Sequence, residues 1–316
     1  MANVLAMDGF IFKKNQIMSR KLDLSIIVVN FNTKTFLKGC LDSLNKNTKN
    51  ISYEIIIVDN ASNDGSVDLI KKYKVEDSKI KTIFNDTNLG FAKANNLGID
   101  KAQGRYILLL NSDTQVNSNV LEDFVSWMDE HQEVGVSSCC LVGSDGKTQS
   151  NGGYFPNILR VGAWMLFVDD IPLVSKLIKP FHPKPSGEAT QIDWVTGAFM
   201  FIRAGVIGKI GCLDERYFMY VEDVDFCMRA NLAGYTVWYL PKMSILHFGG
   251  ASSNSEYSLV SEYKNIKIFY KKHYVDWQFP LLRFFLFVGA ILRIFVLGIL
   301  TGSRSVKIYV NAIRQI

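Results

Sequence analysis

Three aspartates stand in sequence contexts that suit catalysis or metal binding. Asp59 and Asp113 each follow an apolar run that is typical of a strand buried on both faces. Asp223, which follows Glu222, opens a predicted helix. Because ligands of open α/β sheets bind at the carboxyl ends of the strands, we expect Asp59 and Asp113 to share one site. A carboxylate such as Asp223 can serve as a general base toward a hydroxyl group.

Polar side chains follow three of the predicted strands. The three clusters are Asn30 with Asn32, then Asp59 with Asn60 and Ser62, then Asn111 with Ser112 and Asp113. Asn, Asp and Ser are also common turn formers, so turn chemistry is the alternative interpretation of any one cluster. Three clusters at equivalent strand ends favour one shared ligand site.

The absence of two common nucleotide-binding motifs limits the class of ligand that the site could bind. No GxGxxG fingerprint follows the first strand, which disfavours a nicotinamide enzyme, and the chain has no GxxxxGK[ST] phosphate loop. Asp59 can accept hydrogen bonds from a nucleobase imide or a ribose. Asp113 suits a divalent metal, because magnesium prefers one or two carboxylates plus substrate phosphates to a full protein cage.

Two of the candidates also have plainer interpretations. Acids in the first turn of a helix, such as Glu222 and Asp223, stabilise it through capping and the helix dipole. His247 lies between apolar residues, as a packed core histidine would. As a metal ligand it would complement Asp113, since imidazole suits manganese and other transition ions better than magnesium.

The elements that must position these residues follow from hydrophobic periodicity. Short apolar strands alternate with helical stretches up to residue 110, which predicts a mostly parallel α/β sheet flanked by helices. The proline-rich segment 154–185 is expected to be a loop. The expected strands are 24–29, 54–58, 80–84, 105–110, 135–142, 194–203, 235–240 and 243–248, and the expected helices are 36–44, 67–73, 91–102, 120–131 and 223–233.

Composition and charge exclude several classes of protein. The 316 residues are 48% hydrophobic and 21% charged, which is ordinary for a globular protein and excludes a disordered chain. The net charge of +5 is concentrated in residues 264–316, which hold nine basic residues and one acid, so a general nucleic-acid binder is not expected. Five cysteines without CxxC spacing suggest neither a disulfide framework nor a zinc site and fit a reducing compartment.

A long apolar run lies near the C-terminus, at residues 279–300, and only Arg283 and Arg293 interrupt it. It is long enough to cross a bilayer. Arg293 near the midplane would cost roughly 2.5–3.5 kcal/mol. A helix lying in the interface would instead let both arginines reach anionic headgroups, and this is the interpretation we favour. A buried helix or a dimer contact is the alternative.

Several short segments follow one another in an order and with a spacing that are typical of a known family. They are Val29-Asn30-Phe31-Asn32, Val58-Asp59-Asn60-Ala61-Ser62, Asn88-Leu89-Gly90-Phe91-Ala92 with Asn95-Asn96, Asn111-Ser112-Asp113, Trp194-Val195-Thr196-Gly197-Ala198, Glu222-Asp223-Val224-Asp225 and His247-Phe248-Gly249. Over residues 24–253 the chain resembles the family-2 inverting glycosyltransferases of the GT-A fold. It is most similar to the rhamnosyltransferase-like branch of bacterial surface-polysaccharide enzymes.

The resemblance implies a role for each matching residue. Asp223 is the expected catalytic base, with Glu222 beside it, and Asp113 and His247 are the expected ligands of Mg²⁺ or Mn²⁺. The chain departs from the family at Asn111, where the metal motif usually has its first acid. Acceptor contacts are implied for Trp194, Gly197 and Ala198, and nucleotide or donor contacts for Val29, Asn30, Asn32, Asp59, Asn60, Ser62, Asn88, Gly90, Asn95, Asn111 and Ser112.

The resemblance also implies an activity and its surroundings. A sugar would move with inversion from a nucleotide-sugar donor, dTDP-rhamnose or else a UDP-hexose, to a hydroxyl of a polyprenyl-linked or growing polysaccharide acceptor. The expected place is the cytoplasmic face of the inner membrane. The expected divisions are an extension at 1–21, a GT-A domain at 22–255 with nucleotide-binding (22–115) and acceptor-binding (116–255) halves, and a basic, apolar, membrane-associating helical tail at 256–316.

Two rival functions use similar residues. A nucleotidyltransferase would also need acids and a metal at strand ends, but it would usually carry a Gly-rich basic loop after the first strand, which this chain lacks. A non-catalytic, membrane-bound partner with the same fold is the second rival. The intact acids Asp59, Asp113 and Asp223 argue against it.

Overall fold

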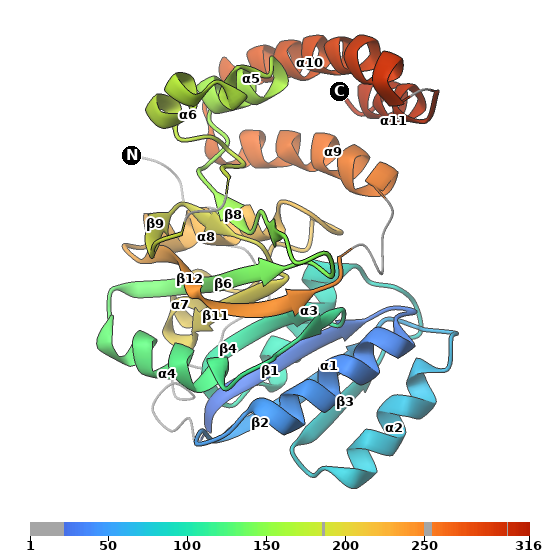
Figure 1. Ribbon diagram of the computed structural model, residues 1–316, viewed down its shortest axis with the longest axis vertical. Coiled ribbons are helices and arrows are strands. Elements are labelled where there is room, and N and C mark those ends of the chain that lie inside the picture. The colour runs from blue at the N-terminus through green and yellow to red at the C-terminus, as the bar shows by residue number, and fades with distance from the viewer. Residues whose placement is uncertain (1–21, 185–186, 250–254, 302) are drawn as a thin grey trace.

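The polar strand ends belong to a ten-stranded mixed sheet with the order β3-β2-β1-β4-β11-β6-β12-β5 (Figure 1). The structure is a computed structural model, which describes residues 22–184, 187–249, 255–301 and 303–316. The predicted extension at 1–21 lies outside the described residues. Four strands form the parallel half: β1 (Leu22–Asn30), β2 (Tyr53–Asp59), β3 (Ile80–Phe84) and β4 (Gly104–Asn111).

Both faces of this parallel half are buried, which explains its continuous apolar runs. Along β1, Ile26 and Val28 pack into the core on one face, and Ile27 packs into the core on the other. Helix α1 (Lys34–Asn47) turns Leu37, Cys40, Leu41 and Leu44 toward the sheet. The other helices of this part are α2 (Ser66–Glu76), α3 (Phe91–Lys101) and α4 (Val120–Glu130). The predicted α/β sheet is confirmed.

The second half of the sheet mixes strand directions. Strand β11 (Phe199–Arg203) is antiparallel to β4 and to β6 (Val134–Val142), and β12 (Thr236–His247) is parallel to β6. The two predicted strands at 235–240 and 243–248 are one strand, with a register shift between Leu240 and Ser244. Short strands β5 (Thr114–Gln115) and β9 (Thr190–Ile192) pair with β12, and β7 (Thr148–Gln149) pairs with β6.

The prediction of one strand over residues 194–203 is wrong. The segment is split into β10 (Trp194–Val195), which pairs with β8 (Gly152–Gly153), and β11, which belongs to the main sheet. The backbone changes partner at Thr196-Gly197-Ala198. Gly197 fits there because a Cβ would lie 2.7 Å from the ring of Phe91. The apolar run hides this break because both pieces are buried.

The prediction of a loop over residues 154–185 is also wrong. The segment folds into α5 (Ile158–Met165), the short 3-10 helix η2 (Val168–Asp170) and α6 (Pro172–Ile178). Asn157 caps α5 by accepting a hydrogen bond from the backbone of Arg160 at 3.0 Å. Pro172 occupies the first turn of α6, where proline is tolerated because that N–H has no partner within the helix. The prolines therefore mark helix ends, and these helices are too short to show a clear period.

Three helices complete the described chain: α9 (Ser255–His273), α10 (Gln278–Thr301) and α11 (Ser303–Ile313). Helices α5, α6, α10 and α11 form an outer layer, and α9 lies between that layer and the sheet (Figure 1). Among the described residues, α10 is the one helix long and apolar enough to cross a membrane. Arg293 of α10 is 6% exposed and faces α5, so the expectation that it reaches lipid headgroups is wrong.

Candidate active site

A pocket of about 860 Å³ opens at the carboxyl ends of β1 and β4. That volume suits a ligand of nucleotide-sugar size. Its wall combines the ends of the parallel strands with residues of the second half of the sheet and of α9. The lining residues include Val29, Phe31, Asn60, Asn88, Gly90, Phe91, Asn111, Ser112, Asp113, Gln149, Thr196, Gly197, Ala198, Phe218, Tyr220, Glu222, Asp223, His247, Tyr257 and Ser258.

The pocket brings together most of the residues predicted for the site. Both expected metal ligands and both expected catalytic acids line it, although they come from distant parts of the chain. Predicted residues in the wall are Val29, Asn60, Asn88, Gly90, Asn111, Ser112, Asp113, Gly197, Ala198, Glu222, Asp223 and His247. Predicted residues that do not line it are Asn30, Asn32, Asp59, Ser62, Asn95 and Trp194.

Several of these other residues support the wall. Asn30 Nδ2 donates hydrogen bonds to Asp59 Oδ2 at 2.8 Å and to Ser62 Oγ at 3.0 Å. The backbone N–H of Ser62 donates to Asp59 Oδ1 at 2.9 Å. The buried Asp59 carboxylate therefore ties the turns after β1 and β2 together, and its contact with a nucleobase stays a prediction. Asn95 donates to the carbonyl of Phe91 within α3 at 2.9 Å, and Trp194 is buried.

Gly90, in the pocket wall, lies against the segment that precedes α8 (Glu222–Leu232). Gly90 precedes α3 with a φ of +82°, and a Cβ there would lie 2.5 Å from the carbonyl oxygen of Phe218. The N–H of Phe91 donates to that carbonyl at 2.7 Å. A glycine is required here by both conformation and space. The Asn88-Leu89-Gly90 turn is thereby fixed against the segment that leads to Asp223.

Asp113 and His247 are brought together by a strand pairing. β5 and β12 pair antiparallel with His247 opposite Thr114, and the N–H of Phe248 donates to the carbonyl of Asp113 at 2.9 Å. His247 Nε2 consequently lies 3.4 Å from Asp113 Oδ1. Both side chains are largely buried at the floor of the pocket.

Gln149 orients the imidazole of His247. Its Nε2 donates to the backbone carbonyl of His247 at 3.0 Å, so its Oε1 must be the atom that lies 2.6 Å from His247 Nδ1. Because that oxygen can only accept, Nδ1 carries a proton, and in the neutral imidazole Nε2 presents its lone pair toward Asp113. Within the described residues, this buried Nε2 has no hydrogen-bond partner. Two acceptor atoms that face each other in this way suit a cation between them.

Asp223 and Glu222 open α8 on the other side of the pocket. Asp223 accepts hydrogen bonds from the backbone N–H groups of Val224 at 2.8 Å and Gly197 at 3.2 Å. Burial raises the pKa of Asp223 to about 6, although these two hydrogen bonds favour the ionised form. Burial, and then the neighbouring Asp223 carboxylate, raise the pKa of Glu222 well above its usual range. The pair is thus suited to hold one negative charge, on Asp223.

The turn before α8 has an unusual backbone. Tyr220 and Val221 both have left-handed conformations, with φ of 73° and 72°. Such a φ is rare for any residue with a side chain and is strained for a β-branched one. The buried Asn265 of α9 donates from Nδ2 to the carbonyls of Met219 and Tyr220, both at 2.9 Å. A residue of the C-terminal helices therefore holds the turn that presents Asp223.

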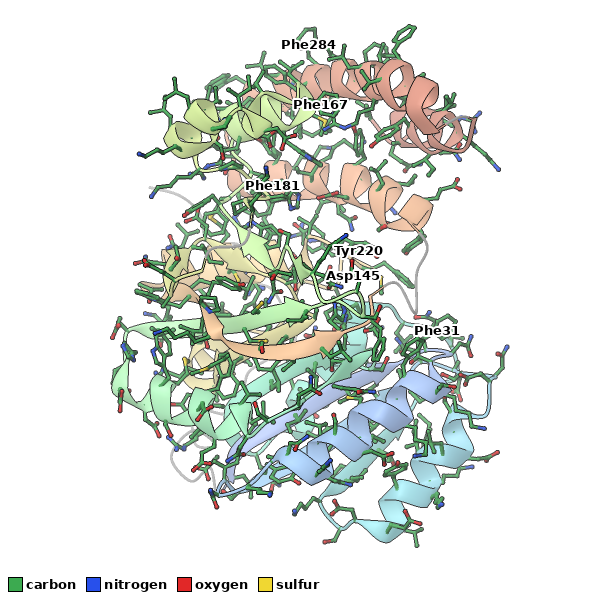
Figure 2. The ribbon with its side chains drawn as sticks, viewed as in Figure 1. Phe31, Asp145, Phe167, Phe181, Tyr220 and Phe284 are labelled. Carbon is green, nitrogen blue, oxygen red and sulfur yellow. The ribbon has the colours of Figure 1, made fainter. Side chains whose placement is uncertain are left out.

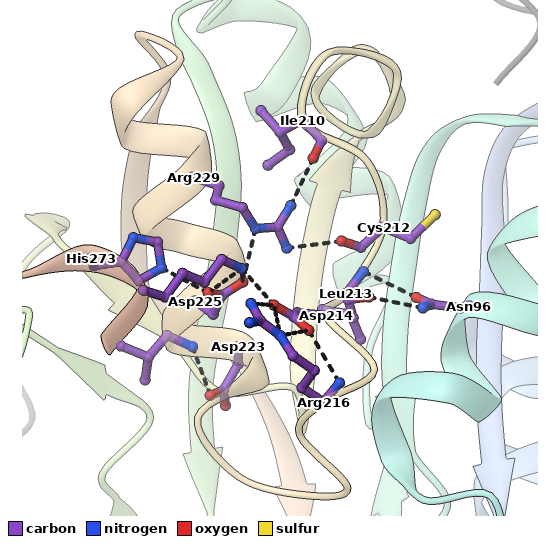
Figure 3. Close-up of polar contacts among 12 residues, drawn as sticks. Asn96, Ile210, Cys212, Leu213, Asp214, Arg216, Asp223, Asp225, Arg229 and His273 are labelled. Atoms are coloured by element: carbon purple, nitrogen blue, oxygen red, sulfur yellow. Dashed lines mark hydrogen bonds and ion pairs between the residues drawn. The ribbon is translucent and has the colours of Figure 1, made fainter. Parts of the chain in front are cut away.

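A second set of contacts joins α8 to the end of α9 (Figure 3). The buried Asp225 accepts a hydrogen bond from His273 at 2.7 Å and pairs with Lys272 at 2.7 Å and Arg229 at 2.8 Å. Burial opposes ionisation of Asp225, but the hydrogen bond from His273 and the charges of Arg229 and Lys272 outweigh it and lower its pKa to about 2. Asp225 is thus a structural anion.

Arg229 does not face the pocket. Besides its pair with Asp225, it donates at 2.8 Å to the carbonyls of Ile210 and Cys212, in and after α7 (Ala204–Ile210) (Figure 3). Arg229 is therefore an ion-paired structural residue.

Several residues that shape the site are not predicted from the sequence. Gln149 and Asn265 have no flanking pattern that sets them apart, and their importance depends on which backbone groups they meet in the fold. Tyr257 and Ser258 lie in α9, and the polar sequence of that helix does not indicate which of its residues reach the pocket. Of these residues, Phe218 is the one that the sequence could have indicated, because it lies shortly before the acidic residues that open α8.

Comparisons with known proteins agree with the geometry of the pocket. The family model "Glycosyl transferase family 2" matches residues 25–204. The chain is 26% identical to the rhamnosyltransferase WbbL of Escherichia coli over 249 residues, which cover 74% of this chain and 86% of that protein. It is 23% identical to the N-acetylglucosaminyl-diphospho-decaprenol L-rhamnosyltransferase of Mycobacterium tuberculosis over 284 residues, 82% of this chain and 87% of that one.

Solved structures show the same fold. TarS residues 1–349 of Staphylococcus aureus superpose with a TM-score of 0.54 at 18% identity, covering 92% of this chain and 81% of that one. The mannosyltransferase PcManGT of Pyrobaculum calidifontis, solved with GDP-Man and Mn²⁺, superposes with a TM-score of 0.56 at 14% identity, covering 94% of this chain and 84% of that one. At these identities the likeness establishes the GT-A fold and no more.

Proposed function

Since the chain belongs to glycosyl transferase family 2 and is a glycosyltransferase, we propose that it moves one sugar from a nucleotide-sugar donor to a hydroxyl of a lipid-linked acceptor in cell-surface glycan synthesis. The preferred donor sugar is L-rhamnose from dTDP-rhamnose, with a UDP-hexose as the alternative. The names of two relatives, both rhamnosyltransferases, support the sugar, and the name of the decaprenol-linked one supports the acceptor.

One observation carries the proposal. A single pocket holds the Asp113–His247 pair at its floor and Asp223 at the start of α8. The first pair suits a divalent cation that would bind the diphosphate of a donor, and the second side chain suits the hydroxyl of an acceptor. Asn60, Asn88 and Gly90 line the same pocket, as donor-binding residues should. Gly197 and Ala198 are the proposed acceptor contacts.

The residues present fit a divalent metal. His247 Nε2 is buried without a hydrogen-bond partner among the described residues, and the Asp113 carboxylate lies 3.4 Å from it. In the described part of the chain no three His, Cys, Asp or Glu side chains are placed to hold a metal ion together, so substrate phosphates would supply the remaining ligands. Mg²⁺ or Mn²⁺ held there would neutralise charge on the leaving diphosphate.

The transfer itself is a single displacement in which Asp223 is the base. The acceptor oxygen forms a bond to the anomeric carbon, its proton passes to the Asp223 carboxylate, and the bond from that carbon to the diphosphate oxygen breaks. Attack opposite the leaving group inverts the anomeric configuration. The N–H groups of Gly197 and Val224 hold the carboxylate in place. Its raised pKa brings its basicity closer to neutral pH, where proton acceptance is most effective.

Release of nucleoside diphosphate from a panel of nucleotide sugars tests the proposal. The assay uses Mg²⁺ or Mn²⁺ and membranes that supply lipid-linked acceptor, with Asp113→Asn, Asp223→Asn and the exposed Asp123→Asn as a matched control. We expect release from one donor, a loss of about 10²–10⁴-fold in Asp223→Asn, and normal turnover in the control. Near-normal turnover of a folded Asp223→Asn would refute the base assignment.

Silence across the whole panel, together with no nucleotide binding by calorimetry, would favour the rival function of a non-catalytic partner. The proposed place of action is the cytoplasmic face of the membrane, because a polyprenyl-linked acceptor is confined to a bilayer. The apolar α10 and the basic C-terminal region support that placement.

A further inference from the structure

Exposed apolar side chains are concentrated on the outer helical layer. Among the residues whose side chains the structure describes, eighteen large apolar ones are exposed, and ten of these belong to α10 or to the segment from α5 to α6. Leu173 and Leu177 of α6 are 79% and 82% exposed, and Phe284 of α10 is 58% exposed and projects away from the sheet (Figure 2). The ten are Leu159, Leu166, Ile171, Leu173, Leu177, Leu281, Phe284, Phe287, Phe295 and Val296.

These two segments are distant in sequence but packed together. Gly289 lets α10 approach α5 closely, since a Cβ there would lie 2.6 Å from Cβ of Met165. The guanidinium of Arg293 donates to the carbonyls of Trp164 and Met165, both at 2.6 Å, at the end of α5. It also lies 4.3 Å from the centre of the Phe167 ring. Arg293 therefore fixes α10 against α5, so that the exposed apolar side chains of both segments lie on one packed unit.

The charges around this surface suit an anionic bilayer. From Gln278 to the end of the chain there is no acidic residue. Arg283 of α10, Lys176 of α6 and Lys179 directly after α6 are exposed. Between residues 154 and 187 the acids are Asp169 and Asp170 of η2. Apolar side chains flanked by cations are typical of a helix that lies in the headgroup region of a membrane.

We propose that α5, α6 and α10 form one composite membrane-docking surface, which lies in the interface of an anionic bilayer. A spanning α10 is disfavoured, because its inner face is packed on α5 and its Arg293 is hydrogen-bonded to carbonyls of the protein. The segment from α5 to α6 would then contact the membrane, a function that its sequence alone does not indicate. The anionic groups that the surface contacts are the lipid headgroups of the bilayer.

This inference rests on the proposed function for its purpose, since only a lipid-linked acceptor requires a docked enzyme. One helix separates the docking surface from the pocket. That helix, α9, contacts α10 and α11 and contributes Tyr257 and Ser258 to the pocket wall. A docked molecule would thus hold its acceptor end near the headgroups, where the sugar of a polyprenyl diphosphate lies.

Vesicle flotation of the full chain tests the surface. The vesicles are phosphatidylcholine alone or mixed with phosphatidylglycerol. The variants are Leu173→Glu with Leu177→Glu on α6, and Phe284→Glu with Phe287→Glu on α10. Val75→Glu is the matched control, because Val75 of α2 is 87% exposed and far from the outer layer. We expect preference for the anionic vesicles, binding weakened at least about tenfold by either double variant, and no change in the control.

Three results would overturn the inference. If the α6 variant binds vesicles like the parent while the α10 variant does not, α10 acts alone. If carbonate washing fails to release the parent, α10 spans. If the parent is a dimer in detergent-free solution and both double variants make it a monomer, the surface is covered by a second copy. Failure of the proposed function is separable, because it would remove nucleotide release from every donor while vesicle binding persisted.

Discussion

The replacement Asn265→Leu isolates the contact between α9 and the turn that carries the proposed base. The side chain is buried, and leucine has a similar volume, so little beyond hydrogen bonding changes. The two hydrogen bonds to the carbonyls of Met219 and Tyr220, each at 2.9 Å, would be lost. The strained turn, with positive φ at Tyr220 and Val221, would then lack this support.

The expected magnitude follows from two opposing free energies. Two buried hydrogen bonds of this kind contribute about 1–3 kcal/mol to stability. Two strained residues cost together about 2–6 kcal/mol, and relaxation of the turn would recover part of this free energy. Because this strain is comparable to what Asn265 contributes, we expect the turn to relax partly in the variant. A shift of Asp223 by about 1 Å would then lower kcat about 10²-fold.

The assay measures kcat, the KM for the donor and the free energy of unfolding. We expect kcat to fall about 10²-fold, the donor KM to change little, and the free energy of unfolding to fall by less than the ~1–3 kcal/mol that the two hydrogen bonds contribute, because the relaxed turn recovers some strain. Asn311→Leu is the matched control, since Asn311 donates at 2.8 Å to Glu256 of α9, away from the turn. A folded Asn265→Leu that is less stable but has a normal kcat would refute the reasoning.

Three further predictions concern single side chains. Burial raises the pKa of Glu222, so above about pH 4.5 the unfolded chain ionises at this residue before the folded chain does, and stability falls as pH rises. Glu222→Gln should therefore raise Tm in thermal melts by a margin that grows as the pH rises above about 4.5. Gln149→Leu should weaken Mn²⁺ binding about 10–100-fold in calorimetry with nucleoside diphosphate, whereas exposed Gln191→Leu should not. Arg293→Met should lower the free energy of unfolding by about 2–4 kcal/mol in denaturant titrations, because carbonyls at the end of α5 lose their donor; an unchanged midpoint would contradict the fixing of α10 by Arg293.

Much of the parallel half was predictable, because burial on both faces leaves a continuous apolar run in each strand. Asp113 and Asp223 were predictable as candidates, since acids after a strand or before a helix are visible locally. What the sequence could not provide is the partner of each group. The pairing of Asp113 with His247 depends on the register of β5 against β12. The tautomer of His247 depends on Gln149, which no local pattern distinguishes.

The helices α5 and α6 were missed for a different reason. Periodicity needs about three turns to be visible, and these helices have eight and seven residues. Their prolines look like breakers, although Pro172 in fact starts a helix. The prediction for Arg293 was wrong because a charged residue within an apolar run indicates only that the charge needs polar partners, and not which groups supply them. The structure supplies carbonyls of α5 as partners where the sequence suggested lipid headgroups.

Helix α9 lies between the outer helical layer and the segment that carries the proposed base. Near its start, Glu256 accepts a hydrogen bond from Asn311 of α11, and Tyr257 reaches the pocket wall. In its middle Asn265 holds the strained turn, and at its end His273 and Lys272 pair with Asp225 of α8. The contacts in the middle and at the end of α9 are hydrogen bonds and ion pairs to α8 and its preceding turn, so a displacement of α9 would reach the segment that carries Asp223. We therefore expect docking on a bilayer to influence the placement of Asp223 through α9.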